Sequence, residues 1–301
     1  MTTNQSTGTG PALAQALSST FDEVQAEGFL HARDLDTAAE VSYRANERVV
    51  LASLFKIPIL LEYARQAATG CLDRQARHTV TAPYRQGGSG SDGCRYDIEL
   101  STRDLAYLMM SISDNAATDR LLDIVGLSNV RAMLDGLGCP GFGVSGCREL
   151  DVPVRRELDM PPGADFDACV AQADEEAIRR LSVRDPAQVP SSTPREVTGL
   201  LAAIWHDQAG PAQACAEVRA VMGRQVWQHR LTSGFEDGVR IAGKTGTEFG
   251  IRNEAGVIEY PNGKRYAVAV FLRTHSMTER QPRADAAIGR AARMAIDALR
   301  G

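Results

Sequence analysis

Lysine is scarce in this chain of 301 residues: only three of its 33 basic residues are lysines, Lys56, Lys244 and Lys264. Arginine carries the same charge, but only lysine releases its proton at an accessible cost and can act as a base. Two of the three stand beside hydroxyl residues, in Ser53-Leu54-Phe55-Lys56 and in Lys244-Thr245-Gly246. Codon bias explains the scarcity but not this placement. Lys264, in a turn-like Pro-Asn-Gly-Lys segment, needs no function.

Long apolar runs and clusters of basic residues are also missing. No stretch approaches eighteen uncharged apolar residues, and no run of five basic residues occurs. A membrane-spanning helix needs about 20 apolar residues, and a net charge of -5 does not favour nucleic acid. The first basic residue is Arg33, so no charged segment precedes an apolar one as in a secretory signal. We therefore expect a cytoplasmic monomer that takes a small-molecule substrate and binds neither membranes nor nucleic acid.

Metal-binding spacings are absent as well. None of the six cysteines forms a Cys-x-x-Cys pair, and no histidine stands at ligand distance from one of them. Structural zinc sites are built from such spacings. We expect six free thiols, no metal and no cofactor.

The residues that are present predict a large globular protein. Apolar spacing predicts helices over 12–27, 51–68, 105–112, 116–125, 130–137, 174–181, 194–206 and 284–299. Alternating apolar residues predict strands over 29–33, 40–43, 240–242, 254–260 and 265–272. The glycine-rich stretch 87–93 is interpreted as a loop, and no Gly-Lys-Ser/Thr follows it, which excludes a phosphate-binding loop.

The order of these elements predicts an α/β (α+β) fold. An antiparallel sheet is built from both ends of the chain, is flanked by the N- and C-terminal helices, and receives an inserted all-α lobe. We predict a disordered tail over 1–11, an α/β lobe over 12–47 and 223–301, and a helical lobe over 48–222. Within the helical lobe, 148–193 forms an unusually long loop.

Ser53 and Lys56 are three residues apart at the start of the apolar helix, so both lie on one face. A serine hydroxyl is a poor nucleophile until a neighbouring base takes its proton. A lysine in a desolvated pocket near a second cation can be that base. Alone, Ser-x-x-Lys occurs by chance in many helices.

Two further segments have ordinary interpretations when each is taken alone. Ser113-Asp114-Asn115 stands between two predicted helices and is typical of an N-cap. Lys244-Thr245-Gly246-Thr247 is typical of a strand that ends in a turn. Together and in this order, Ser-x-x-Lys, Ser-Asp-Asn and Lys-Thr-Gly form the set that characterises class A β-lactamases and penicillin-binding proteins.

From about Phe29 to the C-terminus, the chain resembles the class A β-lactamase-like serine hydrolases, with their β-lactamase/transpeptidase-like fold. The resemblance implies that Ser53 is the acylated nucleophile and Lys56 its proton acceptor. Ser113 would pass a proton to the leaving nitrogen, and Lys244 would order Ser113 and attract a substrate carboxylate.

The resemblance also implies a set of substrate-binding residues. Asn115 would hold the substrate amide. Thr245 and Thr247 would be hydrogen-bond partners beside Lys244, and Gly246 would belong to the same substrate-binding set. The backbone N–H groups of Ser53 and Thr247 would form the oxyanion hole. Arg252 is a candidate for carboxylate binding, with an exposed strand-edge arginine as the alternative.

The sequence departs from the family at the residue that activates water. Hydrolytic class A enzymes carry Glu-x-x-Leu-Asn in the corresponding loop, where the glutamate activates the water that frees the acyl-enzyme. The segment 155–159 matches best, and it places Arg155, which cannot act as a base, at the glutamate position. Glu149 and Glu157 are alternative bases or solvated surface residues.

Three functions therefore remain open. The first is a serine hydrolase that acts on C–N bonds of amides, possibly β-lactams, and is deacylated by water. The second is an acyltransferase or amidase acting on a small metabolite. The third is a β-lactam-binding protein that traps its ligand on Ser53 without turnover.

Overall fold

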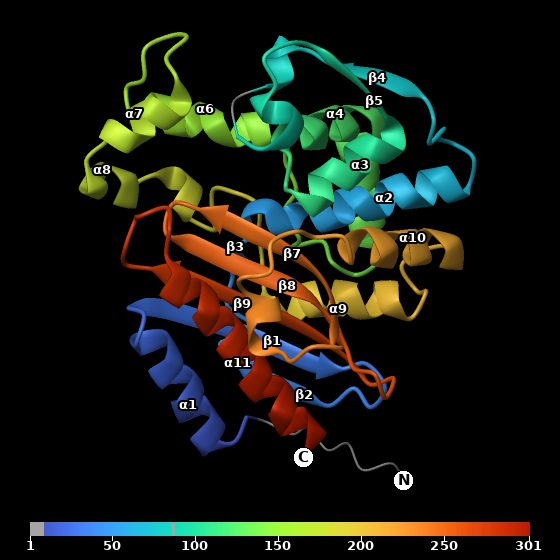
Figure 1. Cartoon of the computed structure of the whole chain (residues 1–301), viewed down its shortest axis with the longest axis vertical. Helices are drawn as coiled ribbons and strands as arrows, with labels where there is room; N and C mark the ends of the chain where they lie inside the picture. Colours follow the sequence, from blue (N-terminus) through green and yellow to red (C-terminus); the bar gives the residue numbers. More distant parts are fainter. Residues whose placement is uncertain (1–8, 86–87) are drawn as a thin grey trace.

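The computed structural model describes residues 9–85 and 88–301, and its centre is a five-stranded antiparallel sheet (Figure 1). The strand order is β2-β1-β9-β8-β7. The bounds are β1 (Ala26–Asp34), β2 (Glu40–Tyr43), β7 (Arg240–Glu248), β8 (Ile251–Glu259) and β9 (Arg265–Thr274). Strands from the two ends of the chain thus pair in the middle of the sheet, which confirms the predicted α+β fold.

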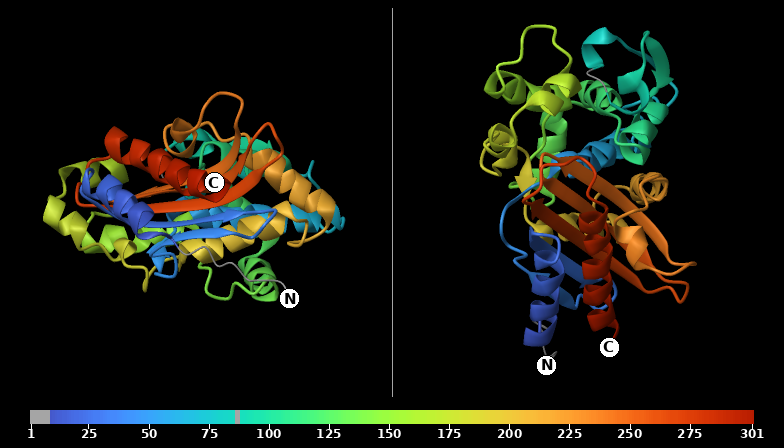
Figure 2. Two further views of the ribbon diagram at one scale, coloured as in Figure 1. Left: turned by 90° about the horizontal axis from the view of Figure 1, so that it is seen from below. Right: turned by 60° about the vertical axis from the view of Figure 1, so that its left-hand side comes forward.

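Two terminal helices cover one face of the sheet (Figure 2): α1 (Pro11–Asp22) and α11 (Pro282–Arg300). They bury an apolar core against β1 and β9, with Leu17, Phe21, Ile288 and Ile296 at its centre. Of the tail predicted over 1–11, residues 1–8 lie outside the described residues, and α1 begins at Pro11.

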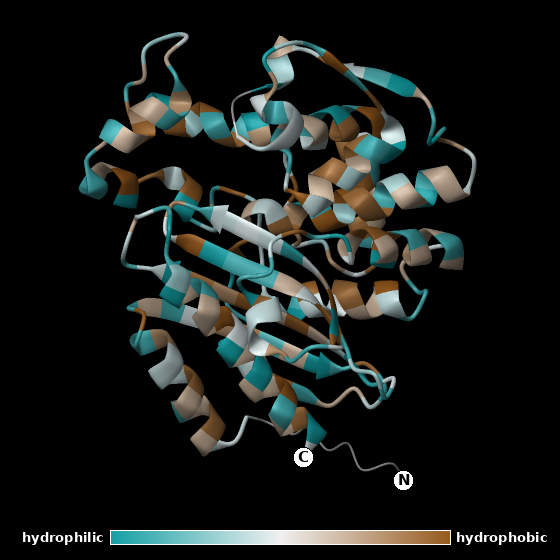
Figure 3. Ribbon diagram, in the orientation of Figure 1, coloured by the Kyte–Doolittle hydropathy of each residue, from teal (hydrophilic) through white to brown (hydrophobic). Residues whose placement is uncertain are grey.

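The other face of the sheet packs against α9 (Pro194–Trp205). Figure 3 shows apolar residues concentrated in α9 and in α3 (Thr102–Ser111). The lobe predicted over 48–222 includes α9, and its buried Leu200, Leu201 and Ile204 join the core that lies between the sheet and the helical lobe. A boundary drawn from the order of helices cannot show which surface an amphipathic helix covers.

The helical lobe is built around α2 (Lys56–Ala68), which is buried along most of its length. Around it lie α3, α4 (Asn115–Val125), α5 (Leu127–Gly136) and α10 (Ala212–Met222). A 3-10 turn, η1 (Ala52–Phe55), leads into α2. Pro58 therefore falls in the first turn of α2, where its missing N–H leaves no intrahelical bond unmade.

The lobe over 48–222 is not purely helical. Short antiparallel pairs join β3 (Val49–Val50) to β6 (Ser191–Ser192), and β4 (Arg77–Val80) to β5 (Ile98–Ser101). Two 3-10 turns, η2 (Ala82–Tyr84) and η3 (Gly90–Gly93), connect β4 to β5, and η5 (Leu231–Gly234) precedes β7. Gly87, part of the predicted loop 87–93, lies outside the described residues.

The long loop over 148–193 is largely helical. It contains α6 (Cys147–Glu157), α7 (Phe166–Gln172), α8 (Glu175–Arg179) and the 3-10 turn η4 (Ser182–Arg184). Val154, Ile178, Leu181 and Val183 are buried together as a small core of its own. The loop is thus a packed subdomain, which runs into β6 and the base of the site. Among the described residues, no helix combines the length and apolar character needed to span a bilayer.

Candidate active site

Ser53 lies in η1, at the entrance of α2, and Lys56 is the first residue of α2. The backbone of Ala52, just before Ser53, has φ of 46°, a left-handed conformation that costs an alanine about 1–2 kcal/mol. The Lys56 side chain is fully buried, whereas Ser53 is partly exposed. The turn therefore keeps Ser53 partly at the surface, while Lys56 is enclosed by the protein.

Lys56 is held by residues of the Ser-Asp-Asn segment. Its Nζ donates to the Ser113 carbonyl oxygen at 2.7 Å and to Asn115 Oδ1 at 2.6 Å, and it lies 3.3 Å from Ser113 Oγ. Ser113 has φ of 66°, so its backbone is bent to aim both its carbonyl and its hydroxyl at the amine. Strained backbone of this kind persists where the surroundings over-determine it, as at many active sites.

Asp114, which lies between Ser113 and Asn115 in the sequence, stabilises the local structure. Its Oδ1 accepts from the Ala117 N–H at 2.8 Å and from Ser91 Oγ at 2.8 Å, and its Oδ2 accepts from the Ser91 N–H at 2.7 Å. The N-cap interpretation of this segment is thus correct for Asp114, which starts α4 and ties it to the loop at Ser91. This N-cap therefore holds Ser113 and Asn115 in contact with Lys56.

Lys244 lies on β7, the edge strand nearest the helical lobe, and is fully buried. Its Nζ donates to the Thr245 carbonyl oxygen at 2.9 Å. Burial, followed by the charge of Lys56, holds the pKa of Lys244 well below its usual value, and Glu254 only partly opposes this. The effect of Lys56 on this pKa indicates that the two buried amines lie near each other.

Thr245 and Thr247 differ in their surroundings. The Thr245 N–H and hydroxyl both donate to Gln225 Oε1, at 2.9 and 3.2 Å. The Thr247 hydroxyl oxygen accepts from Arg230 Nη2 at 2.7 Å, and the residue is exposed. Because that oxygen already accepts a bond from Arg230, its own proton is free to point outward. Gln225 and Arg230 carry no motif, so sequence analysis missed them.

Gly246 marks the closest approach between β7 and the Ser53 turn. A Cβ added there would lie 2.7 Å from the Leu51 carbonyl oxygen and 3.3 Å from Ala52 Cβ. The position therefore admits only glycine, because both neighbours are held by the turn that carries Ser53.

We predict that Gly246→Ala lowers the rate of Ser53 acylation by about 10²-fold, since a shift of about 1 Å at a reacting centre costs that much. Single-turnover kinetics with a chromogenic β-lactam measures the rate. Gly199→Ala is the matched control, because nothing lies within 4 Å of a Cβ at that helical position. An acylation rate in Gly246→Ala equal to that of Gly199→Ala would contradict the close approach.

Arg252 does not face the edge where a substrate carboxylate was predicted to bind. Its Nε and Nη2 donate to the two carboxylate oxygens of Asp285, at 2.8 and 2.7 Å, and its Nη1 donates to the Glu279 carbonyl oxygen. Arg230 shares Asp285 through its Nε at 2.7 Å. The guanidinium of Arg230, not that of Arg252, is therefore the one in contact with Thr247.

Cys147, which directly precedes the long loop, contacts one of the residues that hold Lys56. Its Sγ lies 3.4 Å from Asn115 Oδ1, the same oxygen that accepts from Lys56. The N–H groups of Cys147 and Arg148 donate to the buried Asp119 carboxylate, at 2.6 and 3.0 Å, which pins the start of α6. Burial raises the pKa of the Cys147 thiol to about 12, although Lys56 opposes this.

This contact favours a second alignment of the family pattern Glu-x-x-Leu-Asn with this sequence. The sequence holds two Arg-Glu-Leu-Asp segments, 148–151 and 156–159. The first lies at the site, and aligning on Leu150-Asp151 places Cys147 at the glutamate position. Arg155 instead donates to the Ala164 carbonyl oxygen and stacks on Phe166. The repetition of Arg-Glu-Leu-Asp at 148–151 and 156–159 is the one feature of the sequence that could have indicated the alignment through Cys147.

Neither candidate base is brought to the site. Glu157 is exposed and accepts from the N–H and hydroxyl of Ser182, at 2.8 and 2.6 Å. Glu149 is exposed on the outer face of α6, whereas Cys147, Asp151 and Val154 follow the inner face at helical spacing. Both glutamates are thus surface residues of the loop.

Two other carboxyl groups are perturbed beside the site. Burial raises the pKa of Asp151 to about 6, with Arg155 opposing it. Burial, and to a smaller degree Asp151, raises the pKa of Glu248 to about 7. Glu248 lines a pocket of about 230 Å³ together with Ala52, Phe55 and Leu150. Glu248 follows Thr247 on β7, so this carboxyl group lies at the edge of the site.

The raised pKa of Glu248 predicts a pH-dependent stability. Between about pH 4.5 and 7 the unfolded chain is ionised at this position while the folded one keeps its proton, so stability falls as pH rises through that window. We expect Glu248→Gln to remove on the order of 2 kcal/mol of this decline, allowing for partial exposure of the group. Urea unfolding at a series of pH values measures it. Parallel curves for the two proteins would contradict the assignment.

Residues 9–85 and 88–301 contain no group of three or more histidine, cysteine or acidic side chains placed to hold a metal ion.

Comparison with known proteins agrees with this geometry. A family described as the beta-lactamase enzyme family matches residues 12–299. The beta-lactamase regulatory protein BlaB of Streptomyces cacaoi is 29% identical over 285 residues, covering 89% of this chain and 91% of BlaB. The carbapenem-hydrolyzing beta-lactamase KPC of Klebsiella oxytoca is 27% identical over 279 residues, covering 90% of this chain and 83% of KPC.

Solved structures share the fold. PBP-A aligns over 99% of both chains with a TM-score of 0.76 and 20% identity. A class A beta-lactamase from Mycobacterium abscessus aligns over 96% of this chain and 100% of its own, with a TM-score of 0.77 and 17% identity. With the family match over nearly the whole length, the chain belongs to the beta-lactamase enzyme family, within the superfamily of β-lactamase-like serine hydrolases.

Proposed function

We propose that this protein is a serine acyl-transfer enzyme whose Ser53 is acylated by an amide that carries a carboxylate, such as a β-lactam. The observation that carries the proposal is the position of Lys56. Its amine is buried three residues after Ser53, lies within 3.3 Å of polar atoms of Ser113 and Asn115, and lowers the pKa of a second buried amine, that of Lys244.

The contacts of Lys56 suit a proton acceptor. The Ser113 carbonyl and Asn115 Oδ1 are acceptors only, so they take two N–H bonds from the amine. In the neutral amine, the remaining tetrahedral position is a lone pair, which can take the Ser53 proton. The Ser53 oxygen then attacks the amide carbon, and an alkoxide forms on the carbonyl oxygen.

The alkoxide needs donors, and the edge of β7 offers them. Donation from the backbone N–H groups of Ser53 and Thr247 would stabilise it by about 3–4 kcal/mol per donor. When the C–N bond breaks, the nitrogen needs a proton, and Ser113 Oγ can relay one from Lys56 across 3.3 Å. The product is an ester on Ser53 and a free amine.

A substrate carboxylate fits the cationic end of the site. Lys244 supplies a buried amine there, and Arg230 holds the oxygen of the exposed Thr247 hydroxyl so that its proton can be donated to an anion. The closely paired Arg230 and Asp285 orient Thr247 without occupying the surface themselves.

Hydrolysis of the ester by water is expected to be slow. When Leu150-Asp151 is aligned with the family's Leu-Asn, Cys147 takes the glutamate position. A thiol with a pKa of about 12 stays protonated and cannot activate water. This observation favours a second candidate function, in which the protein remains acylated on Ser53 and acts as a sensor of the acylating compound. A relative that is named as a regulatory protein, BlaB, makes that candidate relevant.

Intact-mass measurement after exposure to penicillins and cephalosporins tests the proposal, with a chromogenic β-lactam followed in parallel. We expect one acyl group on Ser53 and a burst equal to the enzyme concentration, followed by slow turnover. Steady turnover without an adduct would favour rapid hydrolysis, and turnover that needs an added amine would favour acyl transfer. Absence of both adduct and turnover across the panel would contradict acylation by β-lactams.

A further inference from the structure

The two threonines of Lys-Thr-Gly-Thr have different surroundings, although both lie on one face of β7. Thr245 and Thr247 are two residues apart on the strand, and the side chains of such residues share a face. Thr245 is only 6% exposed, whereas Thr247 is exposed. The N–H and the hydroxyl of Thr245 both donate to Gln225 Oε1, and its carbonyl oxygen accepts from Lys244 Nζ. The donors of Thr245 are therefore already in use before a substrate binds.

The amide of Gln225 has one orientation that satisfies its neighbours. The Thr245 N–H is a donor and requires the amide oxygen, which lies 2.9 Å away. Glu254, on the neighbouring strand β8, accepts from the amide nitrogen through Oε1 at 2.8 Å. Glu254 is buried, and its Oε2 accepts from the Leu231 N–H at 2.7 Å. Gln225 is therefore held at both ends of its amide, and its oxygen must face Thr245.

The backbone around Gln225 is fixed next to the helical lobe. Gln225 lies in the segment between α10 and η5, and the N–H of its neighbour Val226 donates to the Ser111 carbonyl oxygen at 3.0 Å. Its side chain thus covers the open edge of β7 beside Thr245. N–H groups two residues apart in a strand point in the same direction, so the N–H of Thr247 is directed to the same edge.

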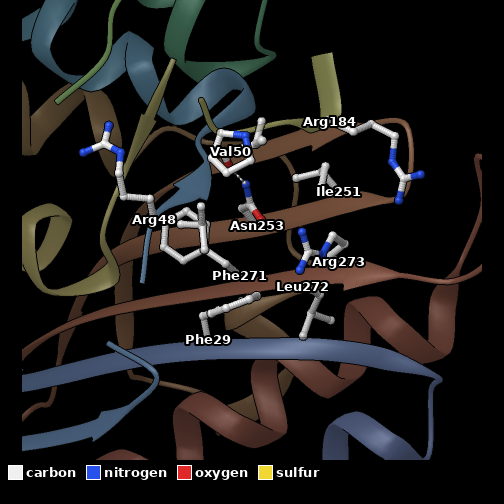
Figure 4. A pocket seen from close by; sticks show the side chains of 11 residues that line it. Phe29, Arg48, Val50, Arg184, Ile251, Asn253, Phe271, Leu272 and Arg273 are labelled. Atoms are coloured by element: carbon white, nitrogen blue, oxygen red, sulfur yellow. Dashed lines mark hydrogen bonds between the residues drawn. The ribbon is translucent and has the colours of Figure 1, made fainter. Parts of the chain in front are cut away.

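Arg230 gives Thr247 a different kind of partner. Its Nη2 donates to the Thr247 hydroxyl oxygen at 2.7 Å, and its Nη1 donates to the Asn253 carbonyl oxygen at 2.7 Å. Figure 4 shows the Asn253 side chain directed at Val50, where its Nδ2 donates to the carbonyl oxygen at 2.9 Å, two residues before η1. The hydroxyl of Thr247 is therefore held in a fixed position relative to η1, and its proton can be donated to a substrate.

We propose that Gln225 is a positioning residue that sets the specificity of the site: it occupies both donors of Thr245, so that a substrate carboxylate is bound by the hydroxyl of Thr247 and not by that of Thr245. This inference rests on the proposed acylation of Ser53 and assigns the carboxylate its hydroxyl partner. In the set implied by the family resemblance, both threonines are hydrogen-bond partners of the substrate. The contacts of Gln225 remove Thr245 from that set.

The isosteric substitutions Thr247→Val and Thr245→Val test the proposal, each with benzylpenicillin and with its uncharged methyl ester. Intact mass followed over time at several concentrations gives the acylation efficiency for each compound, and the ratio of acid to ester isolates recognition of the carboxylate. We expect Thr247→Val to lower this ratio by at least about tenfold, since it loses a hydrogen bond to a charged group. Thr245→Val is expected to keep the native ratio within about threefold, because its hydroxyl does not contact the carboxylate. A purely structural effect would change both efficiencies alike and leave the ratio unaltered.

Gln225→Ala opens the donors of Thr245 to the substrate. In this background we expect Thr247→Val to lower the ratio by less than about threefold, because the carboxylate can bind at Thr245 instead. Gln213→Ala, at an exposed position near the start of α10, is the matched control and should leave the full effect of Thr247→Val intact.

Two results would overturn this inference while leaving the acylation of Ser53 in place. One is an equal loss of the ratio in Thr245→Val and Thr247→Val. The other is an undiminished effect of Thr247→Val in the Gln225→Ala background. Absence of acylation of the native protein by either compound would instead overturn the proposed function, and this inference with it.

Discussion

Replacing Cys147 with glutamate is expected to speed hydrolysis of the Ser53 acyl-enzyme by about 10²–10⁴-fold, the range that a positioned general base contributes. The thiol of Cys147 lies 3.4 Å from Asn115 Oδ1, in the cluster that holds Lys56. A carboxylate there would meet the cationic neighbourhood of Lys56, which favours its ionised form. The rate of decay of the mass adduct, after excess β-lactam is removed, measures the effect.

Cys147→Gln is the matched control, because it has the same length as glutamate but no basic oxygen. We expect it to keep the slow deacylation of the native protein, while acylation proceeds in all three proteins. Equal gains in Cys147→Glu and Cys147→Gln would show that removal of the thiol, not a new base, frees the ester. No gain in either would contradict the placement of α6 against Lys56.

Lys56→Arg is expected to reduce acylation of Ser53 by at least about 10²–10⁴-fold, although arginine is also a basic residue. The guanidinium does not deprotonate in proteins, so it cannot take the Ser53 proton. It is also longer than the amine, and the bonds to Ser113 and Asn115 leave little space for it in a fully buried position. The adduct formed per unit time, read by intact mass, measures the loss.

The same substitution at an exposed position provides the control. Lys264 lies in the turn between β8 and β9, so Lys264→Arg should leave acylation unchanged. Ser53→Ala should abolish the adduct altogether. Full acylation in Lys56→Arg would refute the role of Lys56 as proton acceptor, and an adduct in Ser53→Ala would place the nucleophile elsewhere.

Much of the fold could be predicted because its main elements carry strong periodicity. The helix over 284–299 and the strands over 254–260 and 265–272 were found close to their observed bounds. The helix α10 and the strand β4 were missed. β4 carries a weak pattern, Arg77-His78-Thr79-Val80, of which only Val80 is buried. Its pairing with β5 is decided by tertiary contacts that a local pattern does not contain.

The site shows the same division between local and distant information. Ser53, Lys56, Ser113, Asn115 and Lys244 were proposed from motifs, and the structure brings Lys56 to Ser113, Asn115 and the neighbourhood of Lys244. Arg230 was missed and Arg252 was proposed instead. Both arginines lie near the pair of strands β7 and β8, and the sequence alone does not show which one faces Thr247. The bond from Arg230 Nη2 to the Thr247 hydroxyl shows that Arg230 faces Thr247, whereas Arg252 donates to Asp285 and Glu279.

The long loop was the hardest region to interpret. Its two Arg-Glu-Leu-Asp segments have the same local sequence, and the choice between them depends on Asp119, which binds the N–H groups of Cys147 and Arg148. Asp119 is 28 residues away from Cys147 along the chain. A contact across that separation cannot be read from the segment itself.

The pairing of β1 with β9 has a consequence for how the protein is made. Ala26 to Asp34 align with Thr274 to Tyr266, so the middle of the sheet joins segments separated by more than 200 residues. During synthesis from the N-terminus, the edge of β1 that pairs with β9 stays unpaired until residue 274 has left the ribosome. The helical lobe around α2 can already assemble by then. Contacts this distant slow folding, and the waiting strand is the segment most in need of a chaperone.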